Sequence, residues 1–334
     1  MNEQIPGQVE ILDAFKMLQD RALNDAVPVD GYVVIPLSRA RDDLYLGWSS
    51  ADELALIVVT EPSAILPPPV RLAALSADFG TFSLLSENGQ ERSLRVSSLR
   101  CSSSENSVAD IFATVCSSLA KSLAIRPREH ELSFQIARWA GLFWRLAQRV
   151  DTDVVGLAGE LVVMCKATRP DEWLGAWHAD PDDTLDFVFT RGSVEVKTTR
   201  GSTRQHPVSL EQVSKPGTVE RYFASVQVDI AESGEPIGDV VRELSDRIGT
   251  DHARLKLWNV LAKSCGAGLD EVLHRRFDIA QALASVRFYG AKDIPRPRID
   301  EPLPNGVTRV KFTSDFALAH EIGLQQVELA LGVG

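Results

Sequence analysis

The alternating stretch at 185–200, LDFVFTRGSVEVKTTR, constrains the fold of this chain more than any other segment. Apolar side chains recur at every second position along 185–189 and again along 193–199, which is the period of β-strands. Arg191 and Gly192 lie between the two runs and suit a tight two-residue turn. The sequence therefore predicts a β-hairpin with one apolar face and one charged face.

The charged face of this hairpin gathers two acids and one lysine. The register that follows from the turn sets Asp186 opposite Lys197, with Glu195 one step along. On the apolar face it sets Phe187 opposite Val196. Mg²⁺ prefers oxygen ligands and lowers the pKa of a bound water, and an ammonium group can stabilise charge on a phosphate. The trio therefore suits phosphodiester hydrolysis. An Asp–Lys pair on the solvated face of an ordinary hairpin is the alternative.

Residues 154–165, VVGLAGELVVMC, predict a buried helix that carries a single acid. Asp153 is suited to cap the first turn of this helix. A carboxylate such as Glu160 is costly in apolar surroundings unless it is neutralised, hydrogen-bonded or bound to a metal. Gly156 and Gly159 beside it would let a strand or another backbone approach closely. Glu160 is therefore a candidate metal ligand, with a structural pairing to an arginine or to backbone amides as the alternative.

Periodicity elsewhere predicts helices and short strands on both sides of this region. Helices are expected at 8–24, 107–124, 131–149, 236–248, 252–265 and 268–276. Strands are expected at 31–37, 44–48, 54–60, 70–75, 81–85, 93–99, 172–177, 222–230, 277–290 and 305–314. The aromatic residues of 131–149, Phe134 and Trp144 among them, are more typical of a packed core than of a base-stacking surface. The patterns divide the chain into a mostly β domain with helices at 1–128, a core at 129–232, and a helical and β extension at 233–334.

Composition limits the classes to which the chain can belong. With 334 residues, 44% of them hydrophobic and 24% charged, it has the balance of a soluble globular protein. No uncharged apolar run reaches the roughly 18–20 residues that cross a bilayer, and the first residues lack the features of a signal peptide. Cysteines with neither disulfide nor metal-finger spacing stand at Cys101, Cys116, Cys165 and Cys265. We therefore expect a cytoplasmic protein with reduced thiols.

The charge distribution favours a polyanion near the hairpin. The net charge of −11 excludes a generally basic nucleic-acid coat. Residues 191–221 nevertheless carry six bases against three acids, so the hairpin lies in a locally basic segment.

A helix with a glutamate, a strand with an aspartate and a next strand with Glu-x-Lys together resemble the PD-(D/E)XK nuclease superfamily, which has the restriction-endonuclease-like fold. More narrowly, the chain is similar to a bacterial family of unknown function, of the domain of unknown function 4420 type, which is assigned to that superfamily. The segments that carry this resemblance are GLAGEL at 156–161, the Trp/Gly segment at 173–177, LDF at 185–187, EVKTT at 195–199 and HPVSLEQV at 206–213. The similarity continues through 286–298 and 303–312.

The resemblance implies an α/β (α+β) fold, in which a central mixed sheet of about four strands is flanked by helices, and divalent-metal-dependent cleavage of DNA. By position, Asp186 and Glu195 would be metal ligands and Lys197 the catalytic lysine. Glu160 would be the accessory acid and a further metal ligand, and Gln212 an accessory polar residue.

One position departs from the motif of the superfamily. Leu185, and not proline, precedes Asp186. A literal Pro-Asp pair occurs at Pro181-Asp182, in the loop before the strand. We prefer Asp186 because the hairpin register directs it towards Lys197.

The segment after the hairpin is a candidate contact with DNA. Arg200, Arg204 and His206 form a basic loop, and arginine matches the geometry of phosphate. An ordinary solvated loop is the alternative. Ser209 can cap a short helix that contains Gln212.

These observations predict a Mg²⁺-dependent endonuclease acting on DNA, with Mn²⁺ able to substitute. The resemblance places it in bacterial restriction or phage defence, where further proteins of a defence operon would be partners and a dimer is one open oligomeric state. A catalytically inactive nuclease-fold subunit that binds DNA or a partner protein is the first alternative. The second is a structural interaction protein, which a Glu160 remote from the hairpin would favour.

Overall fold

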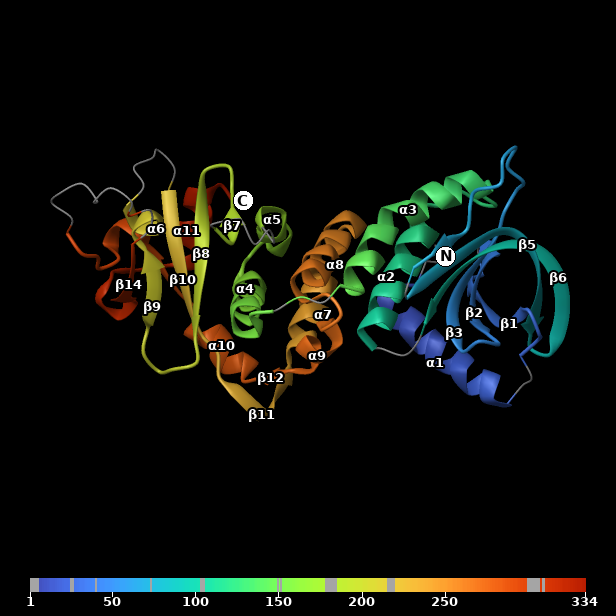
Figure 1. The fold of residues 1–334 in the computed structure, drawn as a ribbon, viewed down its shortest axis with the longest axis horizontal. Helices are drawn as coiled ribbons and strands as arrows, with labels where there is room; N and C mark the ends of the chain where they lie inside the picture. The colour runs from blue at the N-terminus through green and yellow to red at the C-terminus, as the bar shows by residue number, and fades with distance from the viewer. Residues whose placement is uncertain are drawn as a thin grey trace. The chain divides into compact units, whose positions relative to one another are not determined.

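The computed structural model describes residues 6–24, 27–39, 41–72, 74–102, 106–148, 150, 152–177, 185–214, 220–298, 307 and 310–334. The chain is a mixture of helices and sheets that forms two compact units (Figure 1). The first consists of Met1–Val150 with Leu261–Asp270, and the second of Asp151–Val260 with Glu271–Gly334. In the part of the chain so described, no helix combines the length and the apolar character that spanning a membrane requires.

The first unit is built on a closed sheet. Its elements are α1 (Gln8–Asn24), β1 (Gly31–Ser38), β2 (Arg41–Ser49), β3 (Glu53–Val59), β4 (Val70–Arg71), β5 (Leu75–Glu87), β6 (Gln90–Ser102), α2 (Asn106–Ser122) and α3 (Glu129–Leu146). The strand order is β1-β2-β3-β6-β5-β4, and β1 also pairs in parallel with β5. This last pairing closes five strands into a barrel, which the sequence did not predict because it joins segments far apart in the chain.

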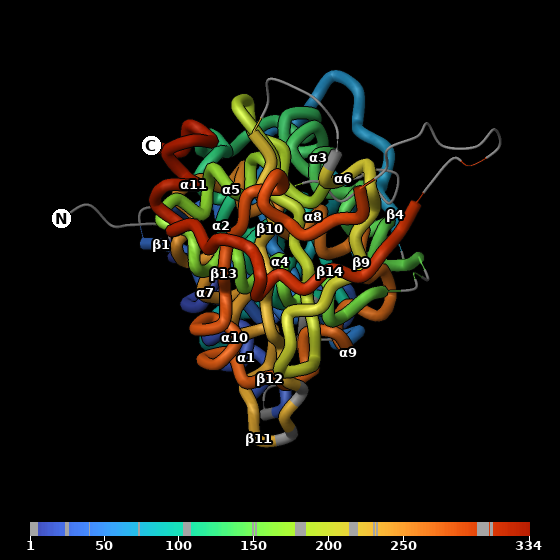
Figure 2. The backbone as a smooth tube through the Cα atoms, turned by 90° about the vertical axis from the view of Figure 1, so that its left-hand side faces the viewer, coloured from blue at the N-terminus to red at the C-terminus, as the bar shows by residue number. Residues whose placement is uncertain are grey.

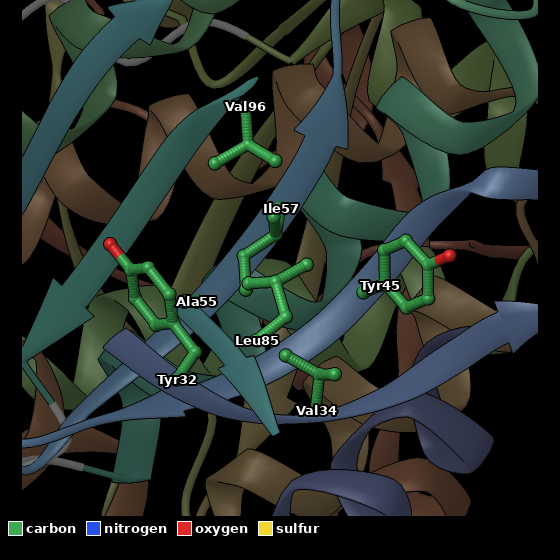
Figure 3. Close-up of a cluster of buried hydrophobic side chains, with 7 residues drawn as sticks. All are labelled: Tyr32, Val34, Tyr45, Ala55, Ile57, Leu85 and Val96. Atoms are coloured by element: carbon green, nitrogen blue, oxygen red, sulfur yellow. The ribbon is translucent and has the colours of Figure 1, made fainter. Parts of the chain in front are cut away.

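Alternating apolar side chains fill the barrel (Figure 3). The buried cluster consists of Tyr32, Val34, Tyr45, Ala55, Ile57, Leu85 and Val96. On α3, Trp139 and Phe143 are buried as predicted. Phe134 and Trp144 are not: their exposed fractions are 71% and 58%. The apolar face of α3 is therefore wider than the surface that its neighbours cover.

The second unit contains a mixed sheet of five strands, where about four were predicted. In the order β15-β13-β10-β8-β7, these strands are β15 (Glu321–Ile322), β13 (Arg287–Gly290), β10 (Glu220–Gln227), β8 (Gly192–Thr199) and β7 (Phe187–Val188). β8 and β10 are parallel, and the other neighbours are antiparallel.

Helices and short strands surround this sheet. α4 (Val154–Lys166) packs on β8 and β10, and the C-terminal helix α11 (Leu324–Leu331) also contacts the sheet (Figure 2). The remaining elements of the chain are α5 (Pro170–Ala176), β9 (Gln205–Ser209), α6 (Leu210–Ser214), β11 (Ile230–Pro236), α7 (Ile237–Arg247), α8 (Asp251–Cys265), α9 (Leu269–His274), β12 (Arg276–Phe277), α10 (Ile279–Ser285), η1 (Ala291–Asp293), β14 (Lys311–Asp315) and η2 (Phe316–Leu318). The end of α8 and the start of α9 belong to the first unit.

The segment predicted as a strand at 172–177 is the helix α5, so that prediction was wrong. Pro170 at the first helical position and the acids Asp171 and Glu172 in the first turn are typical of a helix N-terminus. Trp177 follows the helix and makes an isolated antiparallel bridge to Phe187. The two tryptophans of this segment therefore reach the sheet from a helix and not from a neighbouring strand.

The predicted hairpin exists, but its turn lies one residue earlier. Phe187 pairs with Val194 and not with Val196, and the N–H of Phe189 donates to the carbonyl of Gly192 at 2.8 Å. The turn residues are therefore Thr190 and Arg191. Gly192 is part of β8, where it pairs with Glu220 of β10 and a Cβ atom would collide with the Glu220 carbonyl oxygen.

The contact between α4 and β8 gives a test of this packing. A Cβ atom at Gly159 would lie 2.0 Å from Oγ1 and 3.1 Å from Cβ of Thr198. We expect Gly159→Ala to lower the free energy of unfolding by about 1–3 kcal/mol, because the stiff threonine and the strand must shift. Urea denaturation followed by tryptophan fluorescence measures this change.

Gly175→Ala is the matched control, since a Cβ atom there meets nothing within 4 Å. This substitution should leave the stability unchanged or raise it by less than about 1 kcal/mol. Equal effects of the two substitutions would contradict the close approach of α4 and β8.

Candidate functional site

Glu160 lies on the capped helix α4, and a tryptophan binds its carboxylate. Asp153 caps the helix as predicted, because its Oδ1 accepts from the N–H of Gly156 at 3.0 Å. The Glu160 side chain is half-buried, and its Oε2 accepts from the indole Nε1–H of Trp177 at 2.6 Å. Loss of hydration and the neighbouring Asp186 carboxylate raise the pKa of Glu160 to about 8, although the indole bond opposes this shift. Glu160 is therefore close to the hairpin acids.

Asp186 lies at the start of β7 and reaches across to β8. Its Oδ2 accepts from the backbone N–H of Val196 at 2.6 Å. One further step along the observed register sets Asp186 beside Glu195, where Lys197 was predicted. Dehydration and the Glu195 carboxylate raise the pKa of Asp186 to about 7, against the opposing effects of Val196 and Lys197.

Glu195 is the most enclosed of the three acids, with an exposed fraction of 7%. Its Oε1 accepts from Nζ of Lys197 and from Nε2 of Gln212, each at 2.7 Å. Its Oε2 is buried without a hydrogen-bond partner. Burial raises the pKa of Glu195 in spite of the lysine and the amide. A buried carboxylate oxygen without a partner is costly, so a ligand for Oε2 would stabilise the site.

Gln212 is oriented by the start of α6. The N–H of Ser209 donates to its Oε1 at 3.0 Å, and its own N–H donates to Oγ of Ser209 at 3.3 Å. This reciprocal arrangement is a capping box and confirms that Ser209 caps the helix. Because its Oε1 is used in the cap, the amide of Gln212 turns its N–H group towards Glu195.

The donors of this site fit a hard divalent cation. The structure brings Glu160, Asp186, Glu195, Lys197 and Gln212 together, and the carboxyl groups supply the oxygen ligands that Mg²⁺ prefers. No three His, Cys, Asp or Glu side chains within the described ranges are already gathered at coordinating distance. Mg²⁺ needs only one or two carboxylates because it keeps several waters. Burial is the first cause of the raised pKa values, and repulsion from a neighbouring carboxylate adds to it for Glu160 and Asp186.

The predicted basic loop is only partly exposed. Arg200 is exposed, but Arg204 donates inwards to the carbonyl and Oγ of Ser225 at 3.0 and 2.8 Å. His206 is 1% exposed, its Nε2 lies 2.8 Å from the same Oγ, and burial lowers its pKa to about 4. Arg204 and His206 both contact a buried serine, so the structure turns these two side chains inwards and away from Arg200 on the surface. The Pro181-Asp182 pair lies outside the described residues.

Trp177 is the site residue that sequence reasoning missed. It stands at the end of the Trp/Gly segment, but its assignment to a strand hid the direction of its side chain. The sequence Pro-Asp-Glu at the start of α5 was the available signal, because it is typical of a helix N-terminus. A helix at 170–176 places Trp177 directly after its last turn, where the residue can contact the sheet.

The raised pKa values predict how stability depends on pH. Between about 4.5, the ordinary value for Glu160, and about 8, its value here, the folded chain keeps protons that the unfolded chain has released. The free energy of unfolding should therefore fall as the pH rises through this window without a divalent cation. Mn²⁺ should raise the thermal midpoint more at pH 8 than at pH 5, because it binds the ionised acids. Differential scanning fluorimetry measures both effects.

Glu160→Gln is the control for this titration, since an amide cannot ionise. We expect a flatter dependence of the midpoint on pH in this variant. An equal slope in the variant and in the wild type would show that Glu160 does not titrate in this window.

The chain matches the model of a known protein family. The model of a family described as "Putative PD-(D/E)XK family member (DUF4420)" matches residues 19–317. No curated protein and no solved structure matches the chain significantly. The family match covers most of the sequence and confirms the resemblance seen in its motifs. The chain belongs to this PD-(D/E)XK-type family.

Proposed function

We propose that the protein is a divalent-metal-dependent nuclease that hydrolyses phosphodiester bonds of DNA. The observation that carries this proposal is the buried Oε2 of Glu195, which lacks a partner beside two further acids and a lysine. Glu160 comes from α4, Asp186 from the start of β7, and Glu195 from β8. Three acids from separate elements support a built site more than a chance surface pair does.

Asp186 and Glu195 would hold the cation, with Glu160 as a further ligand. Bound there, Mg²⁺ or Mn²⁺ would polarise a phosphoryl oxygen and lower the pKa of a water that attacks phosphorus. Gln212 fixes the Glu195 carboxylate through Oε1 and leaves Oε2 for the cation. The Asp186 carboxylate is fixed in the same way by the N–H of Val196.

Lys197 supplies the positive charge next to the reacting phosphate. Its Nζ is held 2.7 Å from Glu195, and its side chain lies on the same face of β8. An ammonium group there can orient the attacking water and stabilise the charge that builds on the phosphate. The presence of this lysine with all three acids favours an active enzyme over a catalytically inactive subunit that only binds DNA or a partner.

The substrate and the setting are proposed from the family. Metal-assisted hydrolysis acts on the phosphodiester, and the assignment to a nuclease superfamily favours DNA. Exposed Arg200 remains the candidate phosphate contact of the loop. A role in bacterial restriction or phage defence, in the cytoplasm and with partner proteins of a defence operon, goes with this proposal.

Mn²⁺ binding tests the proposed ligands without knowledge of the DNA substrate. We expect Asp186→Ala and Glu195→Ala to weaken Mn²⁺ binding by at least about tenfold, because each removes a ligand. Isothermal titration calorimetry measures the affinity. Glu211→Ala is the control, since Glu211 is an exposed acid on α6 beside Gln212. Equally weak binding by all four proteins would overturn the metal site and leave a nuclease-shaped binding module.

Lys197→Ala separates chemistry from metal binding. We expect this variant to keep Mn²⁺ binding and to cleave DNA about 10²–10³-fold more slowly, since it loses the group that stabilises the phosphate charge. The assay uses plasmid and phage DNA, modified and unmodified, with Mn²⁺. Wild-type cleavage rates in Lys197→Ala would refute the catalytic role of the lysine. Mn²⁺ binding without cleavage by the wild type would favour the inactive alternative.

A further inference from the structure

Trp177 connects the two acidic elements of the site. Its indole Nε1–H donates to Oε2 of Glu160 on α4 at 2.6 Å. Its backbone forms an antiparallel bridge with Phe187, the residue after Asp186. Trp177 is 2% exposed, and its bond to the half-buried Glu160 is partly shielded from water. One residue therefore links the positions of Glu160 and Asp186.

We propose that Trp177 is a positioning residue that orients the Glu160 carboxylate towards a divalent cation. An indole nitrogen only donates, so it fixes Oε2 of Glu160 and leaves Oε1 for the cation. Donors behind a ligating carboxylate commonly orient it in this way. This inference rests on the proposed function, because the cation site that Trp177 serves is the proposed one.

The chain offers a matched control four residues earlier. Trp173 is fully buried, and its indole Nε1–H also donates to a glutamate, at 3.1 Å, but this acid is Glu328 of α11. Replacement of either tryptophan by phenylalanine removes one buried indole donor to a carboxylate. Only the replacement of Trp177 should change the cation site.

Nuclear magnetic resonance of the full chain labelled with [¹⁵N]tryptophan tests the contact itself. Among the six tryptophans, the indole signal of Trp177 is assigned by its loss in Trp177→Phe. We expect its proton to resonate at low field, because the bond is short and its acceptor is a carboxylate, and to move to higher field in Glu160→Ala. The indole signal of Trp173 should stay in place. A Trp177 signal unmoved by Glu160→Ala would refute the contact.

Mn²⁺ affinity tests the positioning role. We expect Trp177→Phe to weaken Mn²⁺ binding by about tenfold, and Trp173→Phe to leave it unchanged. In a Glu160→Ala background, Trp177→Phe should have no further effect, because the carboxylate that it orients is gone. A purely structural role would weaken binding equally in both backgrounds.

The outcomes separate this inference from the proposed function. Mn²⁺ binding by the wild type with unchanged affinity in Trp177→Phe would overturn the positioning role and leave the metal site in place. Absence of Mn²⁺ binding by the wild type would overturn the metal site and the role of Trp177 with it, even where the indole contact is observed.

Discussion

The burial of three carboxyl groups in one partly dehydrated site is the constraint on which the candidate site depends. The pKa values of Glu160, Asp186 and Glu195 are all raised, first because each acid loses hydration, and a neighbouring carboxylate raises those of Glu160 and Asp186 further. A fold under selection for stability alone would separate such groups or pair each of them. Here a single lysine and a few neutral donors offset the cost of burial only in part, and the cation proposed for the site would complete the balance of charge.

Neutral donors fix the acids without neutralising them. The backbone N–H of Val196 holds Asp186, the amide of Gln212 holds Glu195, and the indole of Trp177 holds Glu160. None of these donors carries charge, so the site keeps its attraction for a cation while the carboxylates keep their orientation. Lys197 is the exception, because the group that donates to Glu195 is its charged ammonium.

The C-terminal helix α11 stabilises the hairpin through Trp173. Glu328 of α11 accepts from the N–H and the Oγ1–H of Thr168 and from the indole of Trp173. The ring of Trp173 packs edge-on against Phe187 and Phe189, with centroids 5.2 Å away in both cases. The last helix of the chain therefore stabilises the strand that begins next to Asp186.

Sequence reasoning grouped the residues of the candidate site correctly because alternation in strands is a local property. It placed Asp186, Glu195 and Lys197 on one face, identified the buried helix with Glu160, and predicted the Ser209 cap that orients Gln212. It failed where a distant segment decides the outcome. Gly192 joins β8 because Glu220 pairs with it, the barrel closes through β1 and β5, and His206 is buried against Ser225 and the ring of Phe316.

The error in the predicted hairpin register did not change which residues share the charged face. Moving the turn by one residue changes every cross-strand partner by two positions, and side chains two apart point to the same face. In the observed register, Asp186 therefore lies opposite Glu195 and not opposite Lys197, but it is still on the charged face. A change of one position would have set Asp186 on the face of the buried Val194 and Val196. In a strand, the set of residues that shares a face is more secure than the pairs within it.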